Sequence, residues 1–214
     1  MSTTPSVDRR RHRHRETSDE IVEHALAVMA ESGAAGLSLG EVARRMHMRT
    51  PSLYVYFPSK AALYDEVFAR GWRAFEEAMR PYAEPLPPAV SLQEHLEGAM
   101  RCALEWSAAH PAYSQLMFWR PVPQWQPTAE SYAAAVAAKD LASRTMTRLR
   151  EQGRLDHTTD VPEAVEVWNL MSTGLISQHM SNEPGVPVPS SLTGALVGPL
   201  VSAFIARYAS RSAA

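Results

Sequence analysis

The segment from Thr50 to Phe57 carries side chains that are suited to contact DNA. Hydroxyl groups bond to phosphates and base edges, and four residues supply them: Thr50, Ser52, Tyr54 and Tyr56. Leu53 and Phe57 lie four residues apart and would form one narrow apolar stripe on a helix. Such a helix fits a DNA groove, but it equally fits a small bundle helix whose tyrosines cover a core.

A second candidate is a cluster of positive charge near the N-terminus. Five arginines stand among the seven residues Arg9–Arg15, with His12 and His14 between them and only Asp8 opposing them nearby. A basic cluster of this kind binds polyanions, and a disordered tail without function has the same composition. Both interpretations stay open, and we expect a flexible arm over residues 1–16.

The sequence offers little for catalysis or for metal binding. Cys102 is the only cysteine, which excludes an internal disulfide and a cysteine-based zinc site. Glu94, His95 and Glu97 share one helical turn but lack a supporting ligand set, and Glu94 is explained as part of a helix cap. We therefore expect no enzymatic activity, no cofactor and no metal, and we expect Cys102 to be a buried, unreactive thiol.

The rest of the chain predicts helices that position these residues. A chain of 214 residues that is 45% hydrophobic, with a net charge of -2, has ample core for one or two domains. Helix capping patterns recur at Thr17/Glu20, Ser38/Glu41, Ser91/Glu94 and Asp160/Glu163. No strand-like alternation is evident, so the fold is predicted to be all-α with about nine helices. They are expected near residues 18–32, 39–47, 50–57, 60–79, 92–109, 111–119, 129–152, 161–181 and 190–209.

Two further features concern the end of the chain and its location. Pro199 should kink or weaken the last helix. The uncharged stretch 184–206 is broken by prolines and is interpreted as a buried helix, not as a membrane span. With no secretory signal pattern after the N-terminal charges, we expect a cytoplasmic protein.

The first three helices have the layout of a helix-turn-helix domain. In that motif a short helix, a tight turn and a second short helix place the second helix in the DNA major groove. The residues Leu37–Ala43 and Thr50–Leu63 resemble the N-terminal domain of the TetR (tetracycline repressor) family of bacterial transcriptional regulators. The resemblance covers about residues 17–65, with one departure at His47-Met48, where the family usually has Gly-Val. Because His tolerates a left-handed backbone less well than Gly, we expect a slightly strained turn.

The resemblance implies which residues meet DNA. It places Thr50, Pro51, Ser52 and Tyr54 toward the groove and makes Lys60 a phosphate contact at the start of the fourth helix, where free backbone amides favour an anion. Arg49 either contacts DNA or is a solvated surface residue, and Tyr56 either contacts phosphate or packs in the core. One residue of the pair Arg44 and Arg45 is expected to touch the DNA backbone. The basic arm becomes a candidate minor-groove or phosphate tether.

The remaining helices are expected to bind an effector and to form a dimer, both mainly because the family does so. Large apolar residues are numerous there, and they either form plain core or line a cavity for a small apolar molecule. The candidates for such a lining are Trp106, Met117, Trp119, Trp168 and Met171. The last two helices have broad apolar faces that serve either a two-fold dimer interface or burial within one chain.

These observations predict a basic arm at 1–16, a DNA-binding domain at 17–65 and an effector-binding and dimerisation domain at 66–214. The predicted protein is a homodimeric, ligand-responsive regulator, a repressor that a small, largely apolar effector releases from a near-palindromic double-stranded operator. The predicted DNA contacts are Arg49, Thr50, Pro51, Ser52, Tyr54, Tyr56 and Lys60. The alternatives are an effector-independent architectural DNA-binding protein and, remotely, an α-helical enzyme.

Overall fold

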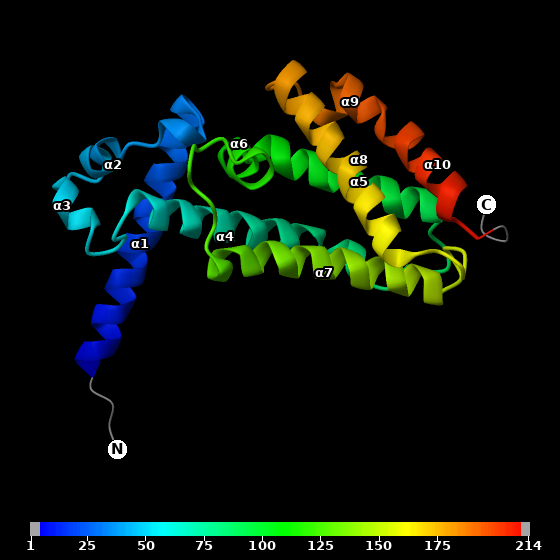
Figure 1. Ribbon diagram of the computed structural model, residues 1–214, viewed down its shortest axis with the longest axis horizontal. Coiled ribbons are helices and arrows are strands. Elements are labelled where there is room, and N and C mark those ends of the chain that lie inside the picture. The colour runs from blue at the N-terminus through cyan, green and yellow to red at the C-terminus, as the bar shows by residue number, and fades with distance from the viewer. Residues whose placement is uncertain (1–4, 211–214) are drawn as a thin grey trace. The chain divides into compact units, whose positions relative to one another are not determined.

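The computed structural model describes residues 5–210, which form an all-α protein as predicted (Figure 1). Its α-helices are α1 (Pro5–Ser32), α2 (Leu39–Arg45), α3 (Thr50–Leu53), α4 (Lys60–Met79), α5 (Leu92–Ala109), α6 (Pro111–Ser114), α7 (Ala129–Glu151), α8 (Val161–Asn182), α9 (Leu192–Ala195) and α10 (Val197–Tyr208). One π-helical turn, Gln115–Trp119, follows α6. No helix among the described residues is both long and apolar enough to cross a bilayer.

The chain divides into two compact units. The first contains the residues up to Gly71 together with Ala112–Tyr132, and the second contains Trp72–Pro111 and the residues from Ala133 onward. Residues 112–132 belong to the first unit by their contacts, although they lie within the range 66–214 predicted for the effector-binding domain. The functional division at residue 65 stays a prediction.

Hydrogen bonds explain why residues 112–132 belong to the first unit. The backbone amide of Ala34 donates to Oε1 of Gln115 at 3.0 Å, and the hydroxyl of Tyr64 donates to the Ala34 carbonyl at 2.8 Å. Asp65 on α4 accepts from the Thr128 amide and from the Ser131 hydroxyl, both at 3.1 Å. These bonds satisfy polar groups of Ala34, of α4 and of residues 112–132, so residues 112–132 complete the core of the first unit.

Helix α1 starts earlier than predicted, and the expected flexible arm is a helix over residues 5–16; residues 1–4 of that arm lie outside the described part. The buried stripe of Ile21, Ala25, Val28 and Met29 is confirmed. The predicted start at residue 18 is wrong because the chain holds neither Gly nor Pro between residues 6 and 32, so nothing interrupts the helix. The hydroxyl of Ser18 donates to the His14 carbonyl at 2.8 Å, as a serine does inside a helix.

The second unit is built around α5, against which both α8 and α10 pack (Figure 1). Trp168 of α8 meets Phe204 of α10 edge to face, with ring centroids 5.3 Å apart, and both side chains are buried. The helix predicted at 190–209 is broken in two at Leu196. Proline lacks an amide proton and its ring clashes with the carbonyl four residues back, which for Pro199 is Ala195, where α9 ends.

The end of α10 is fastened to the loop between α7 and α8. The Tyr208 carbonyl accepts from the Asp156 amide at 2.9 Å and from the Thr159 hydroxyl at 3.3 Å, and the Ser210 amide donates to the Arg154 carbonyl at 3.1 Å. Leu155 and Ala209 form an isolated antiparallel bridge. These bonds close the second unit at the end of the described chain.

Candidate nucleic-acid interface

The turn between α2 and α3 is fixed by backbone geometry. Ser38 caps α2, since its side chain accepts from the Glu41 amide at 3.3 Å. At the other end, the His47 amide donates to the Arg44 carbonyl at 3.2 Å and the Met48 amide donates to the Ala43 carbonyl at 3.0 Å. These two bonds form a Schellman motif, in which His47 takes the left-handed position with φ of 54°. The left-handed turn expected from the sequence is therefore confirmed.

Helix α3 presents one buried and one open side, and Figure 1 shows it beside α2. Leu53 and Phe57 are buried, as the predicted inward stripe requires. Arg49, Pro51 and Tyr54 are exposed, and the Tyr54 side chain keeps 49% of its accessible area. Thr50, Ser52 and Tyr56 are half-buried. None of the predicted DNA contacts is sealed in the core, so hydroxyl, aromatic and guanidinium groups are available along this side.

Lys60, the first residue of α4, is held at the edge of the same surface. Ser59 caps the helix by accepting from the Ala62 amide at 3.1 Å. The Lys60 ammonium lies 5.5 Å from the ring centroid of Tyr64, which is within the range of a cation–π contact. A positive charge at a helix N-terminus adds to the partial positive charge of the backbone amides, so this point favours an anion such as phosphate.

Two carboxylates hold the arginine pair at the end of α2. Glu41 binds Arg44 at 2.7 Å and Arg45 at 2.8 Å, and Glu31 of α1 binds Arg45 at 2.6 Å. Hydrogen bonds from Arg44 and then Arg45 lower the pKa of Glu41 from 4.5 to about 2. Side-chain exposure is 72% for Arg44 and 22% for Arg45. Arg45 therefore ties α2 to α1, and Arg44 is the more exposed member of the pair.

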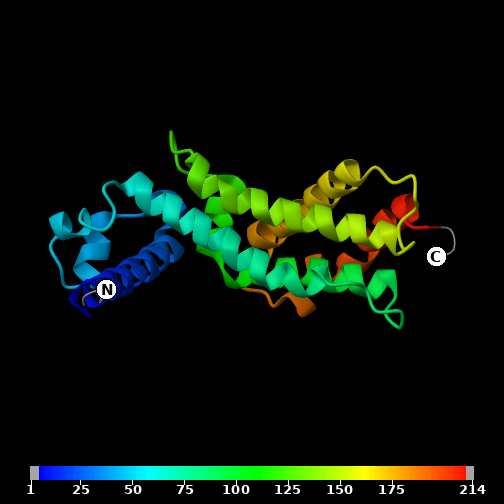
Figure 2. The same ribbon diagram turned by 90° about the horizontal axis from the view of Figure 1, so that it is seen from below.

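A contact between the basic segment and the segment after α3 was not expected from the sequence. The rings of His14 and Tyr56 lie with centroids 4.7 Å apart and planes tilted by 41°. This contact exists because α1 is one continuous helix from Pro5 to Ser32, drawn as an unbroken coil in Figure 2. The signal that could have revealed it is the uninterrupted helix-forming composition of residues 6–32.

The five weak effector candidates are not brought together. Met117 and Trp119 lie in the first unit, while Trp106, Trp168 and Met171 lie in the second. Trp106 stands between Phe75 at 5.2 Å and His110 at 4.6 Å between ring centroids. Trp168 is buried on Phe204, as described above. Their role as an effector lining stays a prediction.

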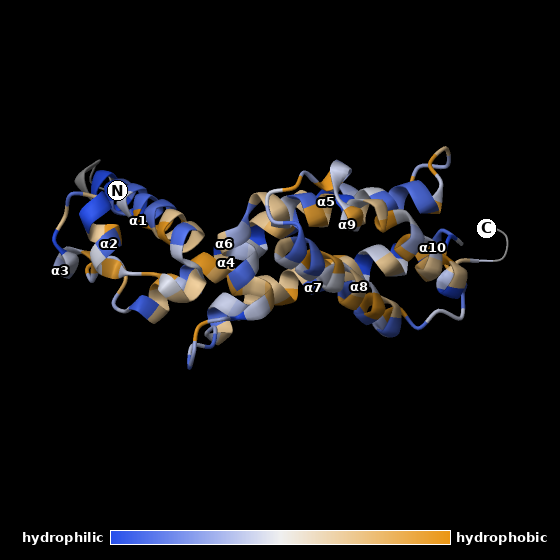
Figure 3. Cartoon of the chain, turned by 90° about the horizontal axis from the view of Figure 1, so that it is seen from above, coloured by the Kyte–Doolittle hydropathy of each residue, from blue (hydrophilic) through white to orange (hydrophobic). Residues whose placement is uncertain are grey.

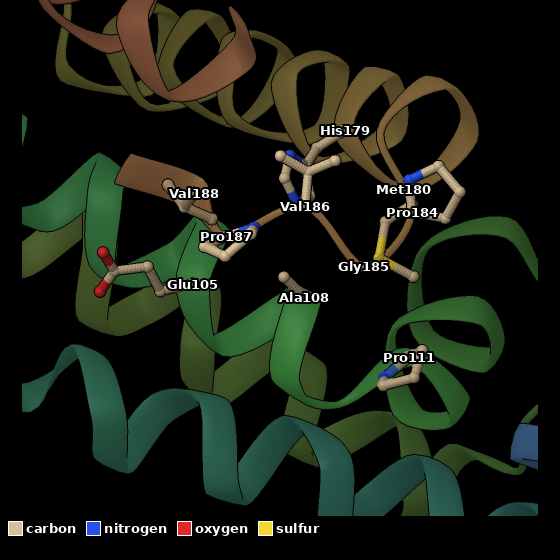
Figure 4. A pocket seen from close by; sticks show the side chains of 10 residues that line it. All are labelled: Glu105, Ala108, Pro111, His179, Met180, Pro184, Gly185, Val186, Pro187 and Val188. Atoms are coloured by element: carbon tan, nitrogen blue, oxygen red, sulfur yellow. The ribbon is translucent and has the colours of Figure 1, made fainter. Parts of the chain in front are cut away.

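A pocket of about 500 Å³ exists in the second unit, and none of the five candidates lines it (Figure 4). It is lined by Glu105, Ala108, Pro111, His179, Met180, Pro184, Gly185, Val186, Pro187 and Val188. The buried imidazole of His179 is fixed by the Thr193 hydroxyl, 2.7 Å from Nδ1. Apart from Glu105 and His179 the walls are apolar, which suits a small molecule with few polar groups.

The residues considered for catalysis do not converge. Glu94 completes a capping box with Ser91, and His95 contacts the Tyr82 carbonyl at 3.1 Å while its burial lowers its pKa. Among residues 5–210 no group of three His, Cys, Asp or Glu side chains is placed to hold a metal ion. Cys102 is half-buried, whereas the sequence predicted a buried thiol. This partial burial raises the pKa of the Cys102 thiol, with a smaller contribution from Glu105. A high thiol pKa lowers the reactive thiolate fraction.

The fold and this surface define a helical protein with a helix-turn-helix unit. Residues 21–67 match the family model described as bacterial regulatory proteins, tetR family. The chain is 26% identical over 129 residues to the HTH-type transcriptional repressor SCO4008 of Streptomyces coelicolor, a match that spans 57% of this chain and 62% of that relative. The chain thus covers less than two thirds of the relative's length.

Solved structures share the whole fold. A TetR family transcriptional regulator from Chloroflexus aurantiacus superposes with a TM-score of 0.66 at 14% identity, covering 92% of this chain and 95% of that one. The transcriptional regulator FadR from Bacillus subtilis, in complex with stearoyl-CoA, superposes with a TM-score of 0.67 at 15% identity, covering 87% and 96%. The match over residues 21–67, together with this shared fold, supports a regulator of the TetR type. Regulators of this family are generally DNA-binding proteins without enzymatic activity.

Proposed function

We propose that the protein is a transcriptional repressor that binds a near-palindromic operator as a homodimer and leaves it when a small, largely apolar effector binds. The observation that carries this proposal is the open side of α3, with Tyr54 exposed above the buried pair Leu53 and Phe57. A helix anchored by one side and rich in hydroxyls on the other is suited to read a major groove. Such a repressor acts on DNA in the cytoplasm.

The predicted contacts divide into two kinds. Thr50, Pro51, Ser52 and Tyr54 are proposed to read base edges and methyl groups, because Pro51 and Tyr54 are exposed and the hydroxyls of Thr50 and Ser52 are only half-buried. Lys60, with Arg49 and Tyr56, is proposed to contact phosphates, which fix orientation but carry no sequence information. Arg44 is a further candidate for a phosphate contact, which its exposed guanidinium would make after leaving its ion pair with Glu41.

Apolar residues on α8, on α9 and between α9 and α10 support the proposed homodimer. Leu170, Leu192 and Leu196 are exposed large apolar residues. An exposed apolar set of this kind is typical of a surface that another protein covers. A two-fold axis would present two copies of α3 to the two halves of a palindromic operator.

The effector is proposed to bind in the helical second unit. The apolar pocket beside α5 supports this, and the fold relative from Bacillus subtilis, solved with stearoyl-CoA, shows that this fold accommodates a ligand with an apolar chain. The lining role of Trp106, Met117, Trp119, Trp168 and Met171 remains part of the proposal. An effector acts only through different affinities for the DNA-bound and released states.

The test is a selection of bound duplexes from random DNA, followed by a screen for compounds that release the preferred duplex. We expect an enriched palindromic site. Lys60→Ala should then weaken binding to every duplex about equally, whereas Thr50→Ala or Ser52→Ala should change the preferred sequence. Lys139→Ala, which removes an exposed lysine from the middle of α7, is the control for loss of charge. Tight binding without any enriched site would favour an architectural DNA-binding protein and would contradict the repressor.

The dimer is tested separately by light scattering. Leu192→Asp combined with Leu196→Asp should convert a dimer to a monomer, because two charges would enter an apolar interface. Val136→Asp on α7 is the matched control, since Val136 is also an exposed apolar residue. A parent protein that is monomeric at micromolar concentration would contradict this part of the proposal.

A further inference from the structure

The N-terminal turns of α1 carry several exposed positive charges. Arg9 to Arg15 are all exposed, and these turns form the hydrophilic end of the helix in Figure 3. His12 pairs with Glu16 at 3.6 Å. Within the described residues, no carboxylate pairs with the guanidinium of Arg10, Arg11, Arg13 or Arg15. Unpaired guanidinium groups on a rigid helix form a surface for an anionic partner.

The contact between His14 and Tyr56 fixes this surface relative to α3. Tyr56 follows α3 directly, and its ring lies 4.7 Å from that of His14. Arg10 and Arg11 precede His14 by four and three residues, so they share its side of the helix. Arg9 precedes it by five residues and lies on nearly the opposite side. Arg10 and Arg11 therefore lie on the same side of α1 as the His14 ring, which contacts Tyr56 directly after α3.

The dimensions of the helix decide which part of DNA it can meet. An α-helix with its side chains is about 10–12 Å wide. The minor groove is about 6 Å wide, so this helix cannot enter it as an extended arm would. Under the proposed function α3 occupies the major groove, which leaves the phosphodiester backbone beside that groove for the arginines.

We propose that the N-terminal part of α1 is a rigid arm that binds DNA phosphates next to the groove read by α3, with Arg10 and Arg11 as the contacts and His14 as the positioning residue. This proposal rests on the proposed DNA-binding function. The arm is a preformed helix and not the flexible tether expected from the sequence, so it avoids most of the ordering entropy that a disordered arm loses on binding.

The experiment measures operator affinity against salt concentration, with the duplex that the selection above enriches. Each phosphate contact contributes about 0.9 to the slope of log affinity against log salt. Arg10→Gln and Arg11→Gln should therefore each reduce the slope by about 0.9. The loss of affinity that each variant causes should then be about eightfold larger at 0.1 M salt than at 1 M salt. Sequence preference should not change, because phosphates carry no sequence information.

Matched variants separate placement from charge. Arg9→Gln removes the same charge from the same helix on the far side, so it should keep the parent slope. His14→Ala should lower the slope without removing an arginine, and His14→Phe should restore it because an aromatic ring can again pack on Tyr56. Equal losses for Arg9→Gln and Arg10→Gln would overturn the rigid arm and indicate a flexible polycation.

The outcomes also separate this proposal from the function on which it rests. A parent protein that enriches no duplex would remove the proposed function itself. A parent that enriches a duplex, together with Arg10→Gln and Arg11→Gln variants that keep the parent slope, would overturn only the arm. Parallel loss of slope in both variants with an unchanged preferred sequence would support it.

Discussion

Replacing His47 by glycine should stabilise the protein. His47 is exposed and holds φ of 54° in the Schellman motif after α2, where glycine is the usual residue. A residue with a side chain loses roughly 1–2 kcal/mol in this conformation because Cβ approaches the following carbonyl oxygen. Glycine removes that contact, so His47→Gly relieves strain without disturbing a buried group.

An opposing effect limits the gain. Glycine gives the unfolded chain more freedom, which disfavours folding by about 0.4–1 kcal/mol. The two effects leave a net stabilisation of about 0.5–1 kcal/mol for His47→Gly, which corresponds to a rise in Tm of about 1–4 °C for a chain of this size. His47→Ala keeps the side-chain strain and loses the polar group that helps His tolerate the left-handed region, so it should be no more stable than the parent.

Urea denaturation followed by far-UV circular dichroism checks this prediction. The expected order of unfolding midpoints is His47→Gly above the parent, and the parent equal to or above His47→Ala. An unchanged slope with denaturant would show that stability alone has changed. If His47→Gly unfolds at lower urea than the parent, the turn is not strained and the reasoning from φ is wrong.

Three further predictions concern other parts of the molecule. The folded pKa of Glu41, about 2, lies below the ordinary 4.5, so ionised Glu41 stabilises the fold above pH 4.5. In urea titrations the parent should therefore be more stable than Glu41→Gln at pH 7, and this difference in stability should disappear as the pH falls from 4.5 to 2. Gly71→Ala should lower Tm, because its new Cβ would lie 2.6 Å from Met117 Sδ and 2.8 Å from Tyr113 Cδ1, and overpacking of this kind costs about 1–3 kcal/mol; a higher Tm would contradict the contact. Burial raises the pKa of Cys102, so a thiol-specific disulfide reagent at pH 8 should modify it far more slowly in the native protein than in urea, and equal rates would show an accessible thiolate.

Local signals predicted most helices well. Helices α4 and α5 begin and end where the caps at Ser59 and Ser91 and the flanking residues indicated. The left-handed turn at His47 and the break caused by Pro199 were also predictable, because each depends on a few neighbouring residues. Such features need no knowledge of distant contacts.

Features that depend on competition between partners were missed. The pattern at Thr17/Glu20 indicated a helix start, but nothing upstream ended the helix, and α1 continues through it. The carboxylates of Glu41 and Glu163 were expected to return to their own capping residues. Instead Glu41 binds Arg44 and Arg45, and Glu163 accepts from the Tyr208 hydroxyl at 2.7 Å. A charged or distant donor here takes the place of the nearby backbone amide at each carboxylate, and local sequence does not show which donors the fold brings close.

The candidate DNA surface was predictable in outline because it depends on local spacing. Leu53 and Phe57 are buried and Tyr54 is exposed because their spacing alone sets the side on which each lies. The contact of His14 with Tyr56 joins residues 42 positions apart and could not be inferred from local spacing. The scatter of the effector candidates has a similar cause, since large apolar residues fill whichever core lies near.

The fastening of Tyr208 and Ser210 to the loop around Arg154–Thr159 has a consequence for biosynthesis. Translation delivers these two residues at and after the end of α10, so α7 and α8 leave the ribosome before the residues that bind their connecting loop have been synthesised. Nascent chains halted short of residue 208 should therefore hold that loop open to proteases, and the loop should become resistant only once the final turn of α10 has emerged.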